Sequence, residues 1–219
     1  MTRVDCSHLL ADNPVIAVMR ARHARDYPPV IGALIAGGVR LIELTLSTEA
    51  VFDELPSLIG EFGDAAILGV GTVTNPMQAQ ASIDRGAEFL VTPTAELDVV
   101  RAAVGAGVPV FPGGLTPTEL HSGWSAGASA VKLFPASTVG VGYLNQLRGP
   151  FPDMLVIPSG GVGIADAAQW ISAGAVAVSV GGPLLGDVFA DGDTAALASR
   201  ARDLTETVRR ARERRHDER

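Results

Sequence analysis

Short apolar runs alternate with longer amphipathic stretches along the whole chain. The runs are rich in valine, isoleucine and leucine and end at glycine, proline or a polar residue, which is typical of buried parallel strands. They predict eight strands, at residues 15–19, 41–44, 66–69, 89–91, 108–111, 130–134, 155–157 and 176–180.

The stretches between these runs are rich in alanine and predict helices. Predicted helices lie at residues 27–36, 48–59, 76–85, 95–106, 116–126, 140–147 and 164–172, and a final polar helix runs from about 194 to about 215. Thr116-Pro117, with Glu119 three residues after the N-cap, has the pattern of a capping box, and Asn75-Pro76 begins in the same way. Glycine-containing turns from helix to strand are expected at 36–38, 85–87, 105–107, 126–128 and 173–175.

This alternation of strand and helix predicts an α/β fold, a single-domain (β/α)8 TIM barrel. No linker or composition break divides residues 1–219, so we expect one domain, with a polar, Arg-rich helix end at about 205–219. An open doubly wound sheet is the alternative. In a barrel, functional side chains are expected at the C-terminal ends of the strands or in the loops that follow them.

Composition and charge exclude several functional classes. The chain is 47% hydrophobic and only 19% charged, which excludes disorder. A net charge of −7, with arginines clustered only at 209–219, argues against a nucleic-acid partner. One cysteine, Cys6, cannot form a disulfide within the chain, and no signal peptide pattern is present. We therefore expect a cytoplasmic protein.

Residues 167–186 are uncharged and have the length of a membrane span. They contain four glycines and Pro183, however. We interpret them as a helix end, a turn, a strand and a glycine loop, so no membrane association is expected.

Lys132 lies within an apolar run, "SAVKLFPAS", in the sixth predicted strand. Burial disfavours the charged ammonium and favours the neutral amine, which can attack a ketone and form a Schiff base. Glu43 lies in the second predicted strand. Among the candidates at the C-terminal ends of the strands, it is the other ionisable residue that lies within a strand. Local sequence equally allows a structural ion pair between Lys132 and Glu43, or an ammonium that reaches the barrel mouth.

Other candidates also follow strands. Arg20 lies at the C-terminal end of the first strand and could bind a carboxylate through two parallel hydrogen bonds. Thr72 follows Gly71 and offers a hydroxyl at a place where a ligand could approach the backbone. "PSGGVG" at 158–163 and "VGGP" at 180–183 follow the last two strands, where barrels often bind phosphate, although tight turns alone would explain them. The four histidines have no metal-type spacing, which disfavours metal-dependent chemistry.

In order along the chain, these motifs resemble the Schiff-base (class I) aldolases that cleave 2-keto-3-deoxy-6-phosphogluconate (KDPG) and 4-hydroxy-2-oxoglutarate (KHG). The matching stretches are "AVMRA" (17–21), "AGGVRLIELTL" (36–46), "LGVGTVTNPMQ" (68–78), "GAEFLVTP" (86–93), "FPGGLTPTEL" (111–120), "VKLFPA" (131–136), "GPFPDMLVIPSGGV" (149–162) and "WISAGAVAVSVGG" (170–182). The resemblance implies a barrel that is usually a homotrimer, binds a small 2-keto acid and uses no cofactor or metal.

By position, the resemblance implies a role for each candidate. Lys132 matches the Schiff-base lysine and Glu43 the general acid/base, while Arg20 and Thr72 match residues around the pyruvate carboxylate. Pro93 and Phe134 match residues that line the pocket. The distal, phosphate-bearing end of the substrate is held in the family at the positions of Ser159, Gly160, Gly161, Gly181 and Gly182.

Three departures from the family pattern affect the choice of substrate. Some members carry arginine at Ser47, and we expect Arg20 to supply that charge. Threonine is common at Ser159 in KDPG-type members, whereas a galactonate-type subgroup has an apolar residue; serine keeps the hydroxyl, which favours the KDPG type. Serine is common at Pro183, and proline removes both a hydroxyl and a backbone donor.

Three functions follow as hypotheses. The first is reversible aldol cleavage of KDPG, of KHG or of both, giving pyruvate and glyceraldehyde 3-phosphate or glyoxylate, with the galactonate-type acid as a related substrate. The second is a sugar-phosphate isomerase or epimerase that uses Glu43 and Lys132 as acid and base without a covalent adduct. The third is a non-catalytic binding protein on the same scaffold.

Overall fold

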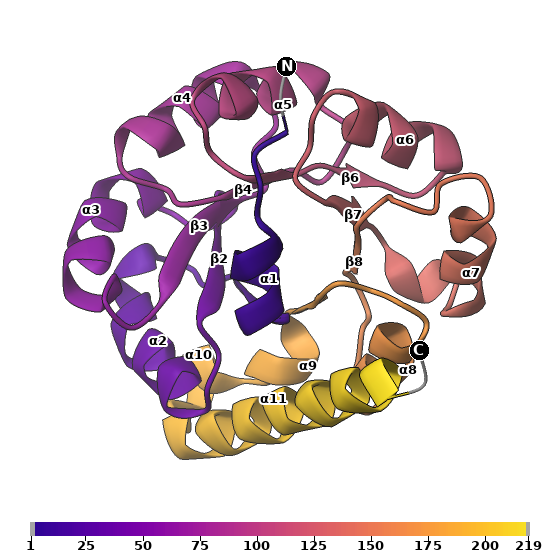
Figure 1. Cartoon of the computed structure of the whole chain (residues 1–219). Helices are drawn as coiled ribbons and strands as arrows, with labels where there is room; N and C mark the ends of the chain where they lie inside the picture. Colours follow the sequence, from indigo (N-terminus) through magenta and orange to yellow (C-terminus); the bar gives the residue numbers. More distant parts are fainter. Residues whose placement is uncertain (1–2, 218–219) are drawn as a thin grey trace.

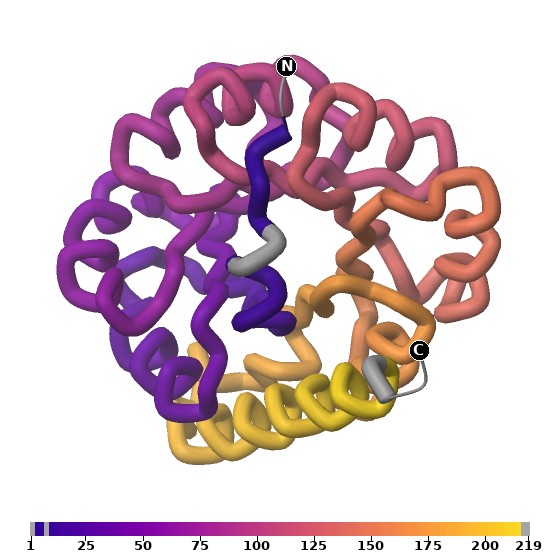
Figure 2. Tube along the Cα trace, in the orientation of Figure 1, coloured from indigo at the N-terminus to yellow at the C-terminus, as the bar shows by residue number. Residues whose placement is uncertain are grey.

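The computed structural model describes residues 3–217 and forms a ring of parallel strands surrounded by helices (Figures 1 and 2). The strands are β1 (Val15–Met19), β2 (Leu41–Thr45), β3 (Ile67–Gly71), β4 (Leu90–Val91), β5 (Val110–Phe111), β6 (Gly113–Gly114), β7 (Val131–Leu133), β8 (Val156–Pro158) and β9 (Val178–Val180). The fold is the predicted α/β TIM barrel, and its strands lie within one or two residues of their expected positions.

Two sheets make up the ring, in the orders β5-β4-β3-β2-β1-β9 and β6-β7-β8. The predicted fifth strand, 108–111, corresponds to β5, and a further strand that was not predicted, β6, follows it after Pro112. Pro112 has no N–H to donate, and at this point the pairing changes: β5 pairs with β4 while β6 pairs with β7. On the other side, Val176 N–H donates to the Val156 carbonyl at 3.1 Å, and Ser159 bridges to Ser179. These contacts close the barrel.

The larger helices cover the outside of the ring. They are α2 (Tyr27–Ala36), α3 (Val51–Phe62), α4 (Pro76–Asp84), α5 (Leu97–Gly105), α6 (Pro117–Ser125), α7 (Gly142–Arg148), α8 (Ile164–Ser172) and α11 (Thr194–Asp217). The capping box of Thr116 and Glu119 is present, and the Asn75 side chain caps α4. All five predicted helix-to-strand turns contain a glycine with positive φ, at Gly38, Gly86, Gly107, Gly127 and Gly174.

Five short helical segments were not predicted. They are α1 (Ser7–Asp12), α9 (Gly182–Leu185), α10 (Val188–Asp191) and two 3₁₀ turns, Ala24–Asp26 and Ala136–Thr138, which together make the chain more helical than expected. Segments of three to six residues carry too little periodicity to be recognised. The predicted helix at 48–59 begins only at Val51, because Thr48 closes a turn on Thr45 and Ala50 is left-handed.

The core has two parts. One lies between strands and outer helices, and the other fills the barrel interior with Ile16, Leu41, Phe89 and Phe111. Cys6, the residue before α1, and Leu10, within α1, join this inner part, so α1 closes the end of the barrel where the strands begin (Figure 1). The active-site candidates lie at the other end.

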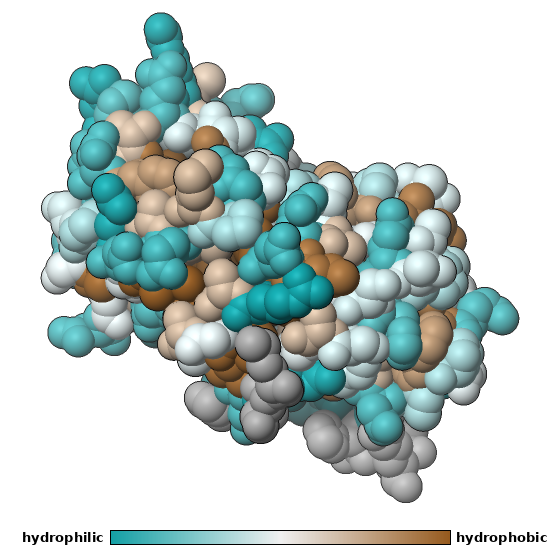
Figure 3. Space-filling model, turned by 90° about the horizontal axis from the view of Figure 1, so that it is seen from above, coloured by the Kyte–Doolittle hydropathy of each residue, from teal (hydrophilic) through white to brown (hydrophobic). Residues whose placement is uncertain are grey.

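The final helix α11 packs on α2 and α8 and carries the Arg-rich end. The structure describes that end as far as Asp217, and residues 218–219 lie outside the described part. Residues 167–186 form a helix end, a turn, β9 and α9, as predicted. None of the helices described is both long and apolar enough to cross a bilayer. Hydrophilic side chains cover much of the face seen from above, with apolar groups between them (Figure 3). That residues 1–219 form one domain stays a prediction.

Candidate active site

Lys132 and Glu43 form an ion pair inside the barrel. Lys132 is the central residue of β7 and Glu43 that of β2, so they come from opposite sides of the ring. Lys132 Nζ lies 3.6 Å from Glu43 Oε1, and the two side chains are 9% and 2% exposed. Each of these two buried groups stabilises the charge of the other, because a buried charge without a partner is strongly unfavourable. The pair expected from the sequence is therefore present.

One oxygen of the Glu43 carboxylate is left over. Oε2 is buried and has no hydrogen-bond partner among the described residues. A buried oxygen in this state is unfavourable unless water or a ligand donates to it. This favours a bound proton donor beside the Lys132 amine.

The wall next to Lys132 is apolar. The Lys132 ammonium lies 5.3 Å from the centre of the Phe134 ring, and Phe134 is 38% exposed although it is a large apolar residue. Pro93 is half-buried and follows β4, where the N–H of Gly113 donates to the neighbouring Thr92 hydroxyl at 3.2 Å. An open aromatic face and a fixed turn beside a buried amine are typical of a pocket wall.

Arg20 and Thr72 lie in the loops after β1 and β3. Arg20 is exposed, and its Nε donates to Ser47 Oγ at 2.9 Å. Thr72 is half-buried and has a φ of 60°, a left-handed conformation that a β-branched residue rarely adopts. Strain of this kind is often found where a ligand is held. Both positions agree with a role at the barrel mouth.

The glycine loops of the last two strands also lie at this end. Gly160 and Gly161 have φ of 82° and 73°, and added Cβ atoms would meet Phe134 and Ser137. Only glycine therefore fits this turn. Gly181 follows β9 directly and Gly182 begins α9. The loop after β8 thus contacts Phe134, next to Lys132.

The Ser159 hydroxyl is buried and bonded within the protein, whereas a substrate-binding hydroxyl is expected to be exposed to the pocket. It is 3% exposed, and its Oγ donates to Ser179 Oγ at 3.2 Å, also 3% exposed. This contact joins β8 to β9 where the barrel closes. The Ser159 hydroxyl is therefore already engaged within the wall.

Sequence reasoning missed three partners of the site residues. Ser179 bonds to Ser159, the Ser47 hydroxyl binds Arg20, and Gly71 leaves room for Glu43. Ser179 could have been suspected from the polar residue inside "VAVSV", but the other two relationships depend on geometry between loops.

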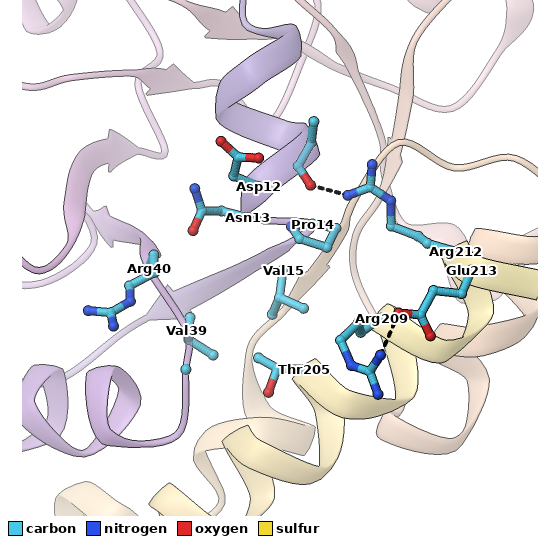
Figure 4. Close-up of a pocket in the computed structure, with 12 residues that line it drawn as sticks. Asp12, Asn13, Pro14, Val15, Val39, Arg40, Thr205, Arg209, Arg212 and Glu213 are labelled. Atoms are coloured by element: carbon cyan, nitrogen blue, oxygen red, sulfur yellow. Dashed lines mark hydrogen bonds and ion pairs between the residues drawn. The ribbon is translucent and has the colours of Figure 1, made fainter. Parts of the chain in front are cut away.

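A separate cavity of about 490 Å³ lies at the opposite end of the barrel, lined in part by residues before β1 and β2 and by α11 (Figure 4). Its arginines are already engaged, since Arg212 donates to the Ala11 carbonyl and Arg209 pairs with Glu213. It contains none of the chemistry described above. Within residues 3–217 no three His, Cys, Asp or Glu side chains gather as a metal site.

Comparison with known proteins agrees with the family resemblance seen in the sequence. The family model for KDPG and KHG aldolases matches residues 6–198. The chain is 36% identical over 172 residues to the 2-dehydro-3-deoxy-6-phosphogalactonate aldolase of Escherichia coli K12, covering 78% of this chain and 84% of that protein. It is 32% identical over 207 residues to the KHG/KDPG aldolase of the same organism, covering 93% and 96%.

A solved structure is also similar over most of its length. It is the KDPG aldolase of Legionella pneumophila with pyruvate captured as a covalent carbinolamine intermediate. Its TM-score is 0.84 and its identity 26%, with 90% of this chain and 97% of that chain covered.

Proposed function

Because the chain belongs to the KDPG and KHG aldolase family, we propose that it is a lyase that cleaves KDPG, KHG or both to pyruvate and an aldehyde through a Schiff base on Lys132. The aldehyde is glyceraldehyde 3-phosphate from KDPG and glyoxylate from KHG, and the reaction is reversible. The observation that carries this proposal is the Lys132 amine, enclosed in the barrel 3.6 Å from the Glu43 carboxylate.

The first step joins Lys132 to the substrate. An ammonium cannot attack a carbonyl, so the amine first gives up a proton, and Glu43 is the nearest acceptor. The nitrogen then adds to C2 of the 2-keto acid to give a carbinolamine. The carbinolamine hydroxyl takes the proton from Glu43 and leaves as water, which gives an iminium ion and restores the Glu43 carboxylate. The Legionella relative, with its pyruvate carbinolamine, supports this step.

The second step breaks the bond between C3 and C4. Glu43, through a water molecule, takes the proton of the C4 hydroxyl, and the bonding electrons move into the iminium. The aldehyde leaves and a pyruvate enamine remains. Return of the proton to C3 and addition of water to C2 release pyruvate and restore the amine. The unpaired Oε2 of Glu43 supports this role, because it is available to a proton donor.

The remaining residues bind the substrate in this proposal. Arg20 and Thr72 hold the carboxylate, and Pro93 and Phe134 line the pocket. The distal end of the substrate meets the loops of Ser159, Gly160, Gly161, Gly181 and Gly182. Backbone groups of the glycines, rather than the Ser159 hydroxyl, provide most of that contact, because the hydroxyl bonds to Ser179.

The galactonate-type acid is a second candidate substrate. The 36% identity to the phosphogalactonate aldolase favours it, as does the engagement of Ser159. Comparing retro-aldol rates on KDPG, its galactonate epimer and KHG decides between the three. Each acid releases pyruvate, so one assay with lactate dehydrogenase serves for all.

Further parts of the proposal concern the whole protein. We infer from the family that it works without a metal or cofactor, as a homotrimer in the cytoplasm. Activity unchanged after dialysis against a chelator, and the mass in sedimentation equilibrium, test the first two.

The central experiment is trapping with pyruvate and borohydride. Reduction of the iminium leaves a stable 1-carboxyethyl group on the lysine nitrogen, and peptide mass analysis should find it on Lys132. Lys132→Met should show no adduct while keeping its fold by circular dichroism. An adduct on another lysine is impossible here, because Lys132 is the only lysine in the chain. Retro-aldol turnover without any adduct would favour the acid–base alternative instead.

A further inference from the structure

Arg20 is tied to the loop after β2 by a chain of hydrogen bonds. Arg20 Nε donates to Ser47 Oγ at 2.9 Å, and Ser47 Oγ lies 3.0 Å from Thr45 Oγ1. Thr45, fully buried, donates to the Met19 carbonyl at 2.9 Å. This series of hydrogen bonds therefore starts at the Arg20 side chain and ends at the backbone carbonyl of Met19, the residue before Arg20.

The direction of every proton in this chain follows from its ends. Thr45 has one hydroxyl proton and gives it to the Met19 carbonyl, so the bond between the two hydroxyls uses the proton of Ser47. The Ser47 oxygen is then free to accept from Arg20, which can only donate. All three groups are satisfied in one orientation.

This arrangement uses only one corner of the guanidinium. Nε is bound, whereas neither Nη atom of Arg20 has a hydrogen-bond partner among the described residues. The two Nη groups form the side of the fork that can grip a carboxylate with two parallel bonds. A bound Nε also limits rotation of a long, exposed side chain, which otherwise loses entropy when it binds.

The backbone beside Arg20 is fixed separately. The N–H of Ala21 donates to Thr48 Oγ1 at 3.1 Å, and the Tyr27 hydroxyl donates to the same oxygen at 2.7 Å. The Ala24 N–H donates to the Glu49 carbonyl at 2.9 Å. Because the loop is held by these contacts, losing the Ser47 hydroxyl should free the Arg20 side chain without moving its backbone.

We propose that Ser47 is a positioning residue that holds Arg20 by Nε, so that both Nη groups face the carboxylate of the 2-keto acid. The inference rests on the proposed function, since it takes Arg20 to be the carboxylate ligand. Ser47 acts on binding and not on bond cleavage, because its hydrogen bonds among the described residues go to Arg20 and Thr45 and none joins it to Lys132 or Glu43.

The test measures the pyruvate concentration that gives half-maximal borohydride trapping on Lys132, together with kcat and KM for retro-aldol cleavage. Ser47→Ala should raise both the half-maximal concentration and KM by roughly three- to tenfold, the usual worth of one hydrogen bond. The value of kcat should change less than twofold. Ser47→Thr keeps the hydroxyl and should restore both values. Ser57→Ala, an exposed serine on α3, is the matched control.

A second measurement separates positioning from a general effect on the loop. In an Arg20→Leu background, Ser47→Ala should change the half-maximal concentration less than twofold, because nothing remains to be positioned. The same effect in both backgrounds, or no effect of Ser47→Ala on the parent, would overturn the inference. If the parent protein itself shows no adduct on Lys132, the proposed function fails instead, and the two failures are distinct.

Discussion

Gly71 lies against the carboxylate of Glu43, at a place where a side chain would collide with it. A Cβ atom built on Gly71 would overlap Glu43 Oε1 and the two carbons before it. Gly71 ends β3 and pairs in register with Thr45 of β2, two residues beyond Glu43. The carboxylate therefore reaches Lys132 over a strand end that has no side chain.

Gly71→Ala should displace the Glu43 carboxylate and lower kcat by about a hundredfold, the usual result of misplacing a catalytic group by about 1 Å. The thermal midpoint should also fall, because the added methyl group has no room. Steady-state turnover and differential scanning fluorimetry measure the two effects.

Two further variants control this result. Gly60→Ala lies in α3 with open space around it, so it should leave kcat unchanged and add about 0.5–1 kcal/mol of stability. In a Glu43→Ala background the carboxylate is gone, so Gly71→Ala should lower the midpoint much less than in the parent. An equal loss in both backgrounds would contradict the stated cause.

Lys132→Met should abolish turnover and also destabilise the fold. Loss of the nucleophile should reduce kcat at least a thousandfold. The unpaired Glu43 carboxylate, 2% exposed, should lower the free energy of unfolding by about 2–4 kcal/mol in urea titration. Lys132→Met/Glu43→Gln removes the charge and should recover at least half of that loss. No recovery would mean that Glu43 is not ionised in the single variant.

Stability should fall in mildly alkaline solution because of Cys6. Burial, and secondly the charge of Asp5, raises the pKa of the Cys6 thiol from 9.0 to about 11. Between these values the unfolded chain has lost the thiol proton and the folded chain has kept it. The folded state therefore binds more protons, and its stability decreases as pH rises through this window.

Thermal midpoints measured between about pH 8 and pH 10 should show this decrease in the parent and a flatter profile in Cys6→Ala. Burial also raises the pKa of Tyr27 from 10.0 to about 12. Tyr27 therefore lowers the stability only above about pH 10, where the unfolded chain begins to lose the tyrosine proton. A Cys6→Ala profile as steep as that of the parent would remove Cys6 as the cause.

Ser159→Ala should affect stability more than substrate binding. It leaves the buried Ser179 hydroxyl without its donor, so unfolding in urea should require about 1 kcal/mol less. KM for the phosphorylated acids should change less than about threefold. Ser159→Ala/Ser179→Ala removes both hydroxyls and should cost no more than the single change. A tenfold rise in KM at unchanged stability would show that the hydroxyl binds substrate after all.

Much of the fold could be predicted from the sequence because each strand and helix carries its own signal. The strand at 130–134 is apolar, and the turn glycines mark where helices end. The change of pairing at Pro112 was harder to predict, since it depends on which neighbours β5 and β6 pair with. The α1 helix was missed because its role, closing the barrel with Cys6 and Leu10, exists only in three dimensions.

The site shows the same division. Lys132 and Glu43 were identifiable because a charged residue inside an apolar strand conflicts with its surroundings. Ser47 and Ser179 were not identified as partners, because serine is common in loops and strands and its hydroxyl can bond in many directions. Their importance comes from the partners that the folded chain brings to them: Arg20 Nε lies 2.9 Å from Ser47 Oγ, and Ser159 Oγ lies 3.2 Å from Ser179 Oγ.

Both ends of the described chain are held at the closed end of the barrel. Arg3 stacks on Trp124 and donates to the Ala128 carbonyl, while Arg212 on α11 binds the Ala11 carbonyl. The two ends of the described part of the chain thus lie on the side of the barrel away from Lys132. Under the proposed function, attaching the protein to a support at this side of the barrel would leave the Lys132 end facing the solution, as a supported catalyst for carbon–carbon bond formation needs.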